Sequence, residues 1–131
     1  METKTLLADF WYFAGSRICM QKDLGINGNL FGGNMLAWMD ESAAIFARQM
    51  TGEKYVVTLR FGEILFKHPV KEGDMVSFKC SVTKRGKTSI SFKIQASTNE
   101  NPVFETDCTF VAVDSSGNKR EISRLGWNVH Q

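Results

Sequence analysis

The spacing of hydrophobic and polar residues divides the chain into a helical part and a β part. From Gly33 to Met50 the sequence is rich in Met, Leu, Ala, Trp and Ile and has no proline, and Gly52 follows as a typical stop signal. This stretch is long enough for a helix of about four to five turns. It is the one convincing helix that the sequence predicts.

Four stretches after this helix predict antiparallel strands, because they are rich in β-branched and aromatic residues. They span residues 55–66, 74–84, 88–97 and 102–113. Between them stand turn-forming residues, at His68-Pro69 with Lys71-Glu72-Gly73-Asp74, at Arg85-Gly86-Lys87 and at Asn99-Glu100-Asn101-Pro102. This arrangement is typical of a meander of adjacent strands.

Alternation along two of these strands predicts that one face of the sheet is apolar. In the strand at 74–84, apolar residues alternate with more polar ones. The apolar series is Val76, Phe78, Cys80 and Val82. The other series is Met75, Ser77, Lys79 and Ser81. The second strand adds Ile90, Phe92, Ile94 and Ala96 to the apolar face.

The order of elements predicts a two-layer α+β domain. Residues 10–20 contain a first strand-like stretch, and residues 21–29 are a turn-rich loop. One long helix would then be wrapped by an antiparallel sheet of about five or six strands. Because the helix is so apolar, we expect it to be covered on more than one side. We also expect four aromatic residues to lie in the core, namely Trp38, Phe46, Phe61 and Phe66.

Length and composition indicate one globular domain. Its 131 residues suggest a core at about 10–122 and a C-terminal tail at 123–131. The net charge of +2 is spread along the chain, which argues against a nucleic-acid partner. No basic leader precedes an apolar stretch, and no run approaches the ~20 residues of a membrane span. We therefore expect a cytoplasmic protein without membrane insertion.

The three cysteines predict neither a disulfide framework nor a zinc site. Cys19, Cys80 and Cys108 are odd in number, widely spaced and each placed in a strand-like run. We expect all three to be small buried hydrophobic residues.

Asp40 is the most informative residue of the predicted helix. At ~100° per residue, Glu41 falls on a polar stripe with Asn34 and Arg48, whereas Asp40 falls on the face of small apolar residues. That face comprises Leu36, Ala37, Ala43, Ala44 and Ala47. A carboxylate there loses hydration and lowers helix propensity. Either it accepts hydrogen bonds from a neighbouring loop or chain, or it is a general base or nucleophile in a cleft walled by alanines.

Gly32 and Gly33 open the same helix. Adjacent glycines leave the first backbone N–H groups unobstructed at the positive end of the helix dipole, which suits an oxyanion; tight packing is the alternative. Asp40 lies about 12 Å along the axis from Gly32. Because this is too far for both to act on one carbonyl, a site that uses both needs a second chain.

Several short motifs follow one another along the chain. They are GNLFGG at 28–33, WMDE at 38–41, VVT at 56–58, FKHPV at 66–70, GD at 73–74, GKTS at 86–89 and FVAV at 110–113. In this order, from about Asp23 to Ile122, they resemble the hot-dog-fold acyl-CoA thioesterases, also called acyl-CoA hydrolases. The ordered series is more specific than any one motif.

The resemblance implies a helix rolled in an antiparallel sheet, with two such units paired edge to edge into a continuous sheet. Active sites of the family lie at the dimer interface, so the chain should form a homodimer or a higher homo-oligomer such as a tetramer or hexamer. By the same likeness Asp40 is the catalytic carboxylate, and the amide near Gly33 takes the oxyanion role. Gly32 and Phe31 would contact the acyl-CoA substrate, and we expect no cofactor and no metal.

Asn27 and His68 mark departures from the family pattern. Many members place an asparagine six residues before the aromatic-Gly-Gly motif, where this chain has Gly25. Either Asn27 takes over that catalytic role or the role is lost. His68 stands where an arginine or lysine is usual, and it is either a substrate contact near CoA or a plain turn residue.

The family resemblance also concerns one basic turn and one strand threonine. Lys84, Arg85 and Lys87 flank the GKTS motif, which in similar proteins lies near the CoA phosphates. Arg85, Lys87, Thr88 and Ser89 are therefore candidate substrate-binding residues, with a solvated turn as the alternative. Thr58 matches a family threonine, which either orients water or is an ordinary strand residue.

The leading hypothesis is an acyl-CoA thioesterase that hydrolyses fatty acyl-CoA to free acid and CoA. A thioester carbonyl is poorly stabilised by resonance and the thiolate leaves readily, so one carboxylate and oriented amide donors suffice. Activation of water by Asp40 and direct attack to form an anhydride both stay open.

Two other functions remain as alternatives. Gly25 and His68 motivate a non-catalytic acyl-CoA or acyl-carrier binding or assembly protein of the same fold. A hydratase or dehydratase is disfavoured, because those enzymes pair a histidine with the carboxylate on or near the helix. This chain has only His68 and His130.

Overall fold

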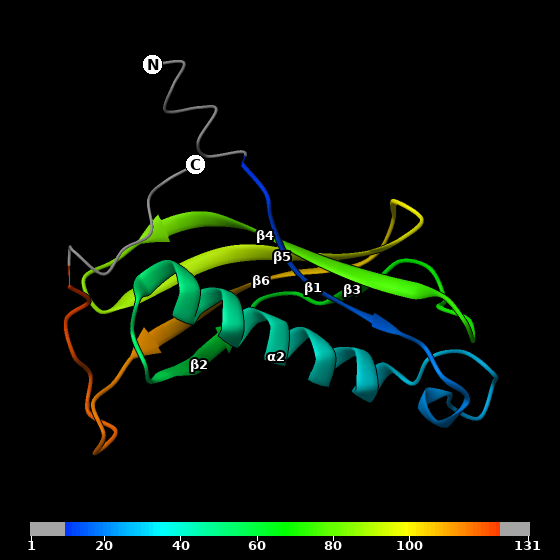
Figure 1. Cartoon of the computed structure of the whole chain (residues 1–131), viewed down its shortest axis with the longest axis horizontal. Helices are drawn as coiled ribbons and strands as arrows, with labels where there is room; N and C mark the ends of the chain where they lie inside the picture. Colours follow the sequence, from blue (N-terminus) through cyan, green and yellow to red (C-terminus); the bar gives the residue numbers. More distant parts are fainter. Residues whose placement is uncertain (1–9, 124–131) are drawn as a thin grey trace.

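Helix α2 lies along one face of an antiparallel sheet in the computed structural model, which describes residues 10–123 (Figure 1). The elements are β1 (Tyr12–Ile18), the 3-10 helix η1 (Gln21–Asp23), α2 (Gly32–Thr51), β2 (Val56–Phe61), β3 (Leu65–Phe66), β4 (Met75–Arg85), β5 (Ser89–Thr98) and β6 (Asn101–Ala112). The sheet has six strands in the order β1-β4-β5-β6-β2, and the short β3 also pairs with β6. The predicted α+β class is confirmed.

Helix α2 begins and ends within one residue of the predicted range. Its C-terminus is closed by Gly52, whose φ of 71° lies in the left-handed region that suits a residue without Cβ. The N–H of Gly52 donates to the carbonyl oxygen of Arg48 at 2.9 Å. No helix within residues 10–123 is both long and apolar enough to cross a membrane.

Three phenylalanine rings from α2 and the central strands form the middle of the core. The ring centroid of Phe46 on α2 lies 4.9 Å from that of Phe92 on β5, at an edge-on angle of 65°. Phe92 stacks in turn on Phe110 of β6, with centroids 5.8 Å apart. All three are buried, and so are Val76, Phe78, Cys80, Ile90, Ile94 and Ala96. The predicted apolar face of the sheet is thus confirmed, with Val82 half-buried at its end.

The sheet covers only one side of α2, so the expectation of cover on more than one side is wrong for the single chain. The buried side includes Met39, Phe46 and Met50, whereas Ala37 and Ile45 on the other side are exposed. A single sheet that curves along the helix contacts only the arc of side chains that faces it. An apolar part of α2 is therefore left uncovered.

Residues 55–66, predicted as one strand, form β2 and β3 instead. Both pair with β6, and the break falls at Gly62, whose N–H donates to the carbonyl oxygen of Asp107 at 2.8 Å. A Cβ at this position would overlap the carboxylate of Asp107. Glycine thus allows the close approach to β6 at which the chain leaves the ladder.

The turn between β5 and β6 is shorter than predicted. Asn99 and Glu100 have positive φ angles of 48° and 67°, which reverse the chain in two residues. Asn101 and Pro102, expected in the turn, already belong to β6.

Two further details differ from the sequence prediction. Residues 21–23 of the predicted loop form η1. Ser81, expected on the polar face of β4, is buried and comes just before a bulge between Val82 and Lys84. The bulge inserts an extra residue, so plain alternation does not describe this end of the strand.

The three cysteines are buried and unbridged, as predicted. Cys80 and Cys108 lie on the inner face of β4 and β6, where burial raises the pKa of both thiols and brings that of Cys108 to about 12. Burial and the carboxylate of Asp23 also raise the pKa of Cys19. These thiols remain protonated at neutral pH.

The segment after β6 folds back over the C-terminal end of α2. Nε of Arg120 pairs with Oε1 of Glu53 at 2.8 Å, and the Glu53 carboxylate is almost fully buried. The N–H of Ile122 donates to the carbonyl oxygen of Lys87 at 2.9 Å, so this segment also holds the turn between β4 and β5. Apart from Ser123, the predicted tail lies outside the described residues.

We expect Phe46→Ala to lower the free energy of unfolding by about 3–5 kcal/mol, because it removes a ring that joins α2 to β5 and leaves a cavity. Urea unfolding at a fixed protein concentration measures this change. Gln49→Ala, on the exposed side of the same helix, is the control and should change stability by less than about 0.5 kcal/mol. Equal losses for the two variants would contradict this account of the core.

Candidate functional site

Asp40 and Thr58 are brought together by the packing of α2 on β2. The hydroxyl Oγ1 of Thr58 donates to Oδ1 of Asp40 at 3.0 Å, across 18 positions of sequence. Both residues are exposed in the single chain. The expectation that Asp40 lies on an interior surface is therefore wrong for one chain alone, since the buried arc of α2 is centred on Met39 and Phe46 and Asp40 lies at its rim.

A bulge in β2 determines which side chains face the helix. Thr58 pairs with the inward-facing Phe110, and the register then shifts so that Arg60 pairs with Thr109. Without the extra residue, Thr58 and Arg60 would lie on the same face, because strand side chains alternate. Instead Arg60 lies on the outer face, where its guanidinium contacts Oδ2 of Asp107 at 3.3 Å. The only cation of β2 is thereby kept away from Asp40.

A groove of about 910 Å³ opens at the start of α2. It is lined by Asn27, Phe31 and Gly32, all three of which the sequence predicted as site residues, together with Phe66 of β3 and Pro69. Gly33 follows directly on the helix. His68 is exposed and adjoins the groove through its neighbour Pro69. The structure therefore gathers one group of the predicted residues around the helix N-terminus.

Asp23 anchors the loop that forms this groove. Its backbone carbonyl oxygen accepts hydrogen bonds from Nδ2 of Asn34 at 2.9 Å and from the N–H of Phe31 at 3.0 Å. Its carboxylate accepts a bond from the N–H of Met20 at 2.9 Å and pairs with Nζ of Lys22 at 3.1 Å. The bond from Met20, with help from Lys22, holds the pKa of Asp23 below its usual range.

Gly33 is held close to the ring of Phe31. A Cβ on Gly33 would lie 2.8 Å from the nearest ring carbon, a contact that would force the ring to move. Glycine at this position therefore lets an aromatic ring lie against the first turn of the helix. The sequence alone left open whether the Gly32-Gly33 pair serves packing or an amide site, and the geometry is compatible with both.

Asp40 and the groove open toward the same edge of the sheet. Asp40 contacts β2 through Thr58, and Phe66 belongs to β3. Both strands pair with β6 along the edge that does not pair with β5. This edge exposes apolar side chains, with Val57 48% and Leu59 60% accessible. Exposed apolar side chains beside an unpaired strand edge are typical of a surface that another chain covers.

The basic turn lies away from the groove. The turn from Arg85 to Ser89 and the loop before α2 stand at opposite ends of the helix (Figure 1). Arg85 pairs with Ile90, Ile90 with Phe110 and Phe110 with Thr58, so Arg85 is three strands distant from Thr58. The backbone of this turn is held by three hydrogen bonds to its carbonyl oxygens. The oxygen of Lys87 accepts from the N–H of Ile122, that of Thr88 from Ala112 and that of Ser89 from Gly86. Within one chain, the predicted substrate residues thus form two separate groups.

Phe66 is the groove residue that the sequence assigned to the core. It is 55% exposed, whereas Trp38 and Phe46 are buried as predicted and Phe61 is half-buried. Its position two residues before His68-Pro69 gave no signal of exposure, because aromatic residues also stand at the ends of buried strands. Only the folded arrangement separates it from the core.

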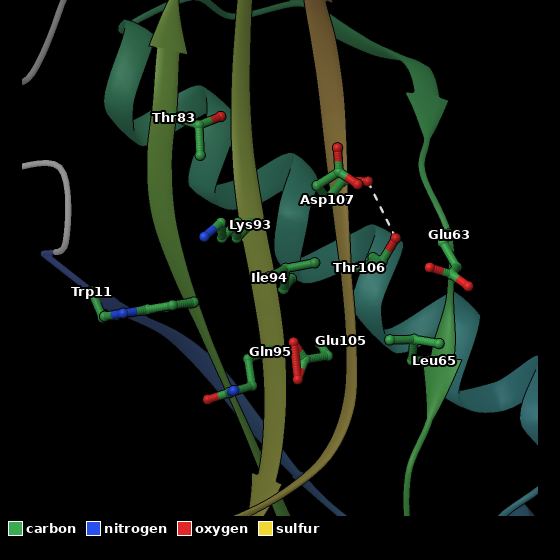
Figure 2. Close-up of a pocket in the computed structure, with 10 residues that line it drawn as sticks. All are labelled: Trp11, Glu63, Leu65, Thr83, Lys93, Ile94, Gln95, Glu105, Thr106 and Asp107. Carbon is green, nitrogen blue, oxygen red and sulfur yellow. Dashed lines mark hydrogen bonds between the residues drawn. The ribbon is translucent and has the colours of Figure 1, made fainter.

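A second hollow, of about 420 Å³, lies mainly on the face of the sheet away from α2 (Figure 2). Two of its carboxylates are paired with cations outside its lining: Asp107 pairs with Arg60, and Glu105 pairs with Lys67. None of the site residues predicted from the sequence lines it. We therefore place the candidate active site at the β2 and β3 edge.

Comparison with known proteins gives consistent matches. Residues 27–105 match the family model described as the thioesterase superfamily. The acyl-CoA thioester hydrolase YciA of Salmonella typhimurium is 34% identical over 118 residues, which are 83% of this chain and 88% of the relative.

Solved structures agree with these matches. A mutant of HI0827, described as a hexameric broad-specificity acyl-coenzyme A thioesterase, superposes with a TM-score of 0.84 at 28% identity, covering 90% of this chain and 91% of the other. A hexameric hotdog fold thioesterase of Campylobacter jejuni gives a TM-score of 0.78 at 31% identity, covering 86% and 91%.

Replacing Asp23 by Asn should make stability less dependent on acid pH. A carboxylate whose folded pKa is lowered stabilises the fold above its unfolded pKa, about 3.9, and this contribution is lost as the pH falls through the folded value. The wild type should therefore exceed Asp23→Asn in free energy of unfolding at neutral pH, and the difference should shrink below about pH 4.

Urea unfolding midpoints across a pH series measure this difference. Glu121→Gln removes an exposed carboxylate and is the control. A constant gap between wild type and Asp23→Asn at all pH values would show that the charge of Asp23 does not contribute.

Proposed function

This chain belongs to the thioesterase superfamily and has the hot-dog fold, which confirms the family resemblance of its motifs, and on that basis we propose that it hydrolyses the thioester bond of acyl-CoA. The observation that carries the proposal is the Asp40–Thr58 hydrogen bond, which holds a carboxylate at an uncovered sheet edge. The relatives described as acyl-CoA thioester hydrolases support the substrate class.

The active site would form between two chains. Two copies paired through their β2 edges would cover Val57 and Leu59 and continue the sheet across the dimer. The Gly32-Gly33 amides of one copy would then face Asp40 of its partner. This arrangement removes the separation of about 12 Å along one helix that prevents both groups from acting on the same carbonyl. The hexameric state of related thioesterases supports an assembly built from such pairs.

In the proposed reaction the thioester carbonyl oxygen accepts hydrogen bonds from the amides at the helix start. Asp40 takes a proton from a water molecule, whose oxygen adds to the carbonyl carbon. The C–S bond then breaks, and the departing thiolate of CoA takes the proton from Asp40, which regenerates the carboxylate. Thr58 donates to one carboxylate oxygen and leaves the other for the water. Direct attack by Asp40, which would give an anhydride that water hydrolyses, uses the same geometry.

Asn27, which lines the groove, would take the catalytic role of the family asparagine. The remaining predicted residues would bind the CoA part. His68 would do so beside the groove, and Arg85 with Lys87, Thr88 and Ser89 would reach the phosphates from another copy of the chain. A non-catalytic acyl-CoA-binding protein is the second candidate, favoured by Gly25 at the position of the family asparagine.

Asp40→Asn should lower kcat for acyl-CoA hydrolysis by about 10²–10⁴-fold, because the amide cannot accept the proton from water. Release of CoA from butyryl-CoA and octanoyl-CoA measures the rate. Glu41→Gln is the matched control, since Glu41 pairs with Arg17 at 2.6 Å and should matter little to turnover. Equal rates for wild type and Asp40→Asn would remove Asp40 from the reaction, and no CoA release by the wild type would favour the binding protein.

Thr58→Val keeps the β-branched shape and removes the hydroxyl that orients Asp40. We expect kcat to fall about tenfold with KM nearly unchanged, which is the cost of losing one hydrogen bond to a charged group. Steady-state kinetics on octanoyl-CoA distinguishes the two parameters. An unchanged kcat would mean that Thr58 is only a strand residue.

A further inference from the structure

Phe66 presents a large aromatic ring to solvent beside the start of α2. It is 55% exposed, although its inner edge contacts Phe104, with ring centroids 5.1 Å apart at 75°. On its other side, ring carbons lie within 3.7 Å of the place where a Cβ of Gly32 would stand. The ring is thus packed on two sides and directs its remaining surface into the groove.

Phe31 is the second aromatic ring that lines the same groove. It is 57% exposed, and its ring lies over Gly33. Leu30 and Pro69 add to the apolar lining of the groove. Two half-exposed rings beside two glycines leave apolar surface whose burial by an apolar group is favourable.

The polarity of the groove restricts what can cover it. Lys22 is the only charged residue that lines the groove among residues 10–123, and its ammonium is already paired with Asp23 at 3.1 Å. Asn27, Asn29 and Asn34 also line it, but Nδ2 of Asn34 donates to the carbonyl oxygen of Asp23 at 2.9 Å and Oδ1 of Asn29 accepts a bond from Lys71 at 3.0 Å. The groove therefore favours an uncharged ligand with an apolar part. Its volume of about 910 Å³ falls within the usual range of small-molecule sites.

We propose that this groove holds the acyl chain of the substrate, and that Phe66 is a specificity-determining residue whose ring sets the preference for chain length. The inference rests on the proposed function, because the acyl group must extend from the carbonyl held at Gly32 and Gly33. An acetyl group ends before the ring, whereas the later methylenes of an octanoyl group lie against it. Each methylene covered in this way should raise the binding affinity about fourfold.

Phe66→Ala tests this role through the ratio of two substrates. We expect kcat/KM for octanoyl-CoA to fall about 10- to 50-fold while that for acetyl-CoA stays within about twofold. Phe66→Leu keeps apolar volume and should restore most of the octanoyl rate, and it also serves if the alanine variant does not fold. Phe13→Ala removes a 69% exposed ring from β1, far from the groove, and should leave the ratio unchanged.

Calorimetric binding of octanoyl-CoA and of CoA to the same variants separates this inference from the proposed function. If the wild type hydrolyses no acyl-CoA, the proposed function fails, but Phe66→Ala should still weaken octanoyl-CoA binding relative to CoA. If the wild type is active and Phe66→Ala lowers kcat/KM equally for octanoyl-CoA and acetyl-CoA, the acyl role of Phe66 is overturned. A change of oligomeric state in Phe66→Ala, measured by light scattering, without a change in the substrate ratio would instead identify the ring as a subunit contact.

Discussion

The packing of one side of α2 on the inner face of the sheet is the constraint on which the rest of the structure depends. Phe46, Phe92 and Phe110 join the helix to the two central strands and fix its rotation about its own axis. That rotation places Asp40 at the rim of the buried arc, within reach of Thr58 on β2. A small rotation inward would bury the carboxylate without a partner, and one outward would break the hydrogen bond.

The same packing leaves apolar surface at one edge of the molecule. Val57, Leu59 and Phe66 are all exposed there, and the neighbouring Asp40 is the one carboxylate of α2 that contacts β2. An edge of this kind is unfavourable in water, and the free energy of covering it can drive association of two chains. In the proposed enzyme, assembly and completion of the active site are thus one event.

Much of this architecture could be predicted from the sequence because it depends on local periodicity. The bounds of α2, the inward series from Ile90 to Ala96 and the burial of the cysteines follow from residue type and spacing. Asp40 itself was found by its conflict with its neighbours on the helix. Its exposure in the single chain was not predictable, because a helical wheel shows which residues share a face but not where the covering sheet ends.

The remaining differences arise from contacts between distant segments. The bulge in β2 that turns Arg60 outward depends on its register with β6, and the break at Gly62 depends on the proximity of Asp107. Phe66 looked like any aromatic residue at the end of a strand, and only its place beside Gly32 separates it from the core. Alternation within one strand contains none of this information.

The burial of Cys19, Cys80 and Cys108 has a practical side. A protonated thiol inside a packed core reacts slowly with disulfide reagents and alkylating agents, which attack through the thiolate. The native protein should therefore react very slowly with such reagents. A chromogenic disulfide added to the reaction would report the sulfhydryl of the departing CoA against almost no background, and the slow appearance of protein sulfhydryls would itself signal unfolding.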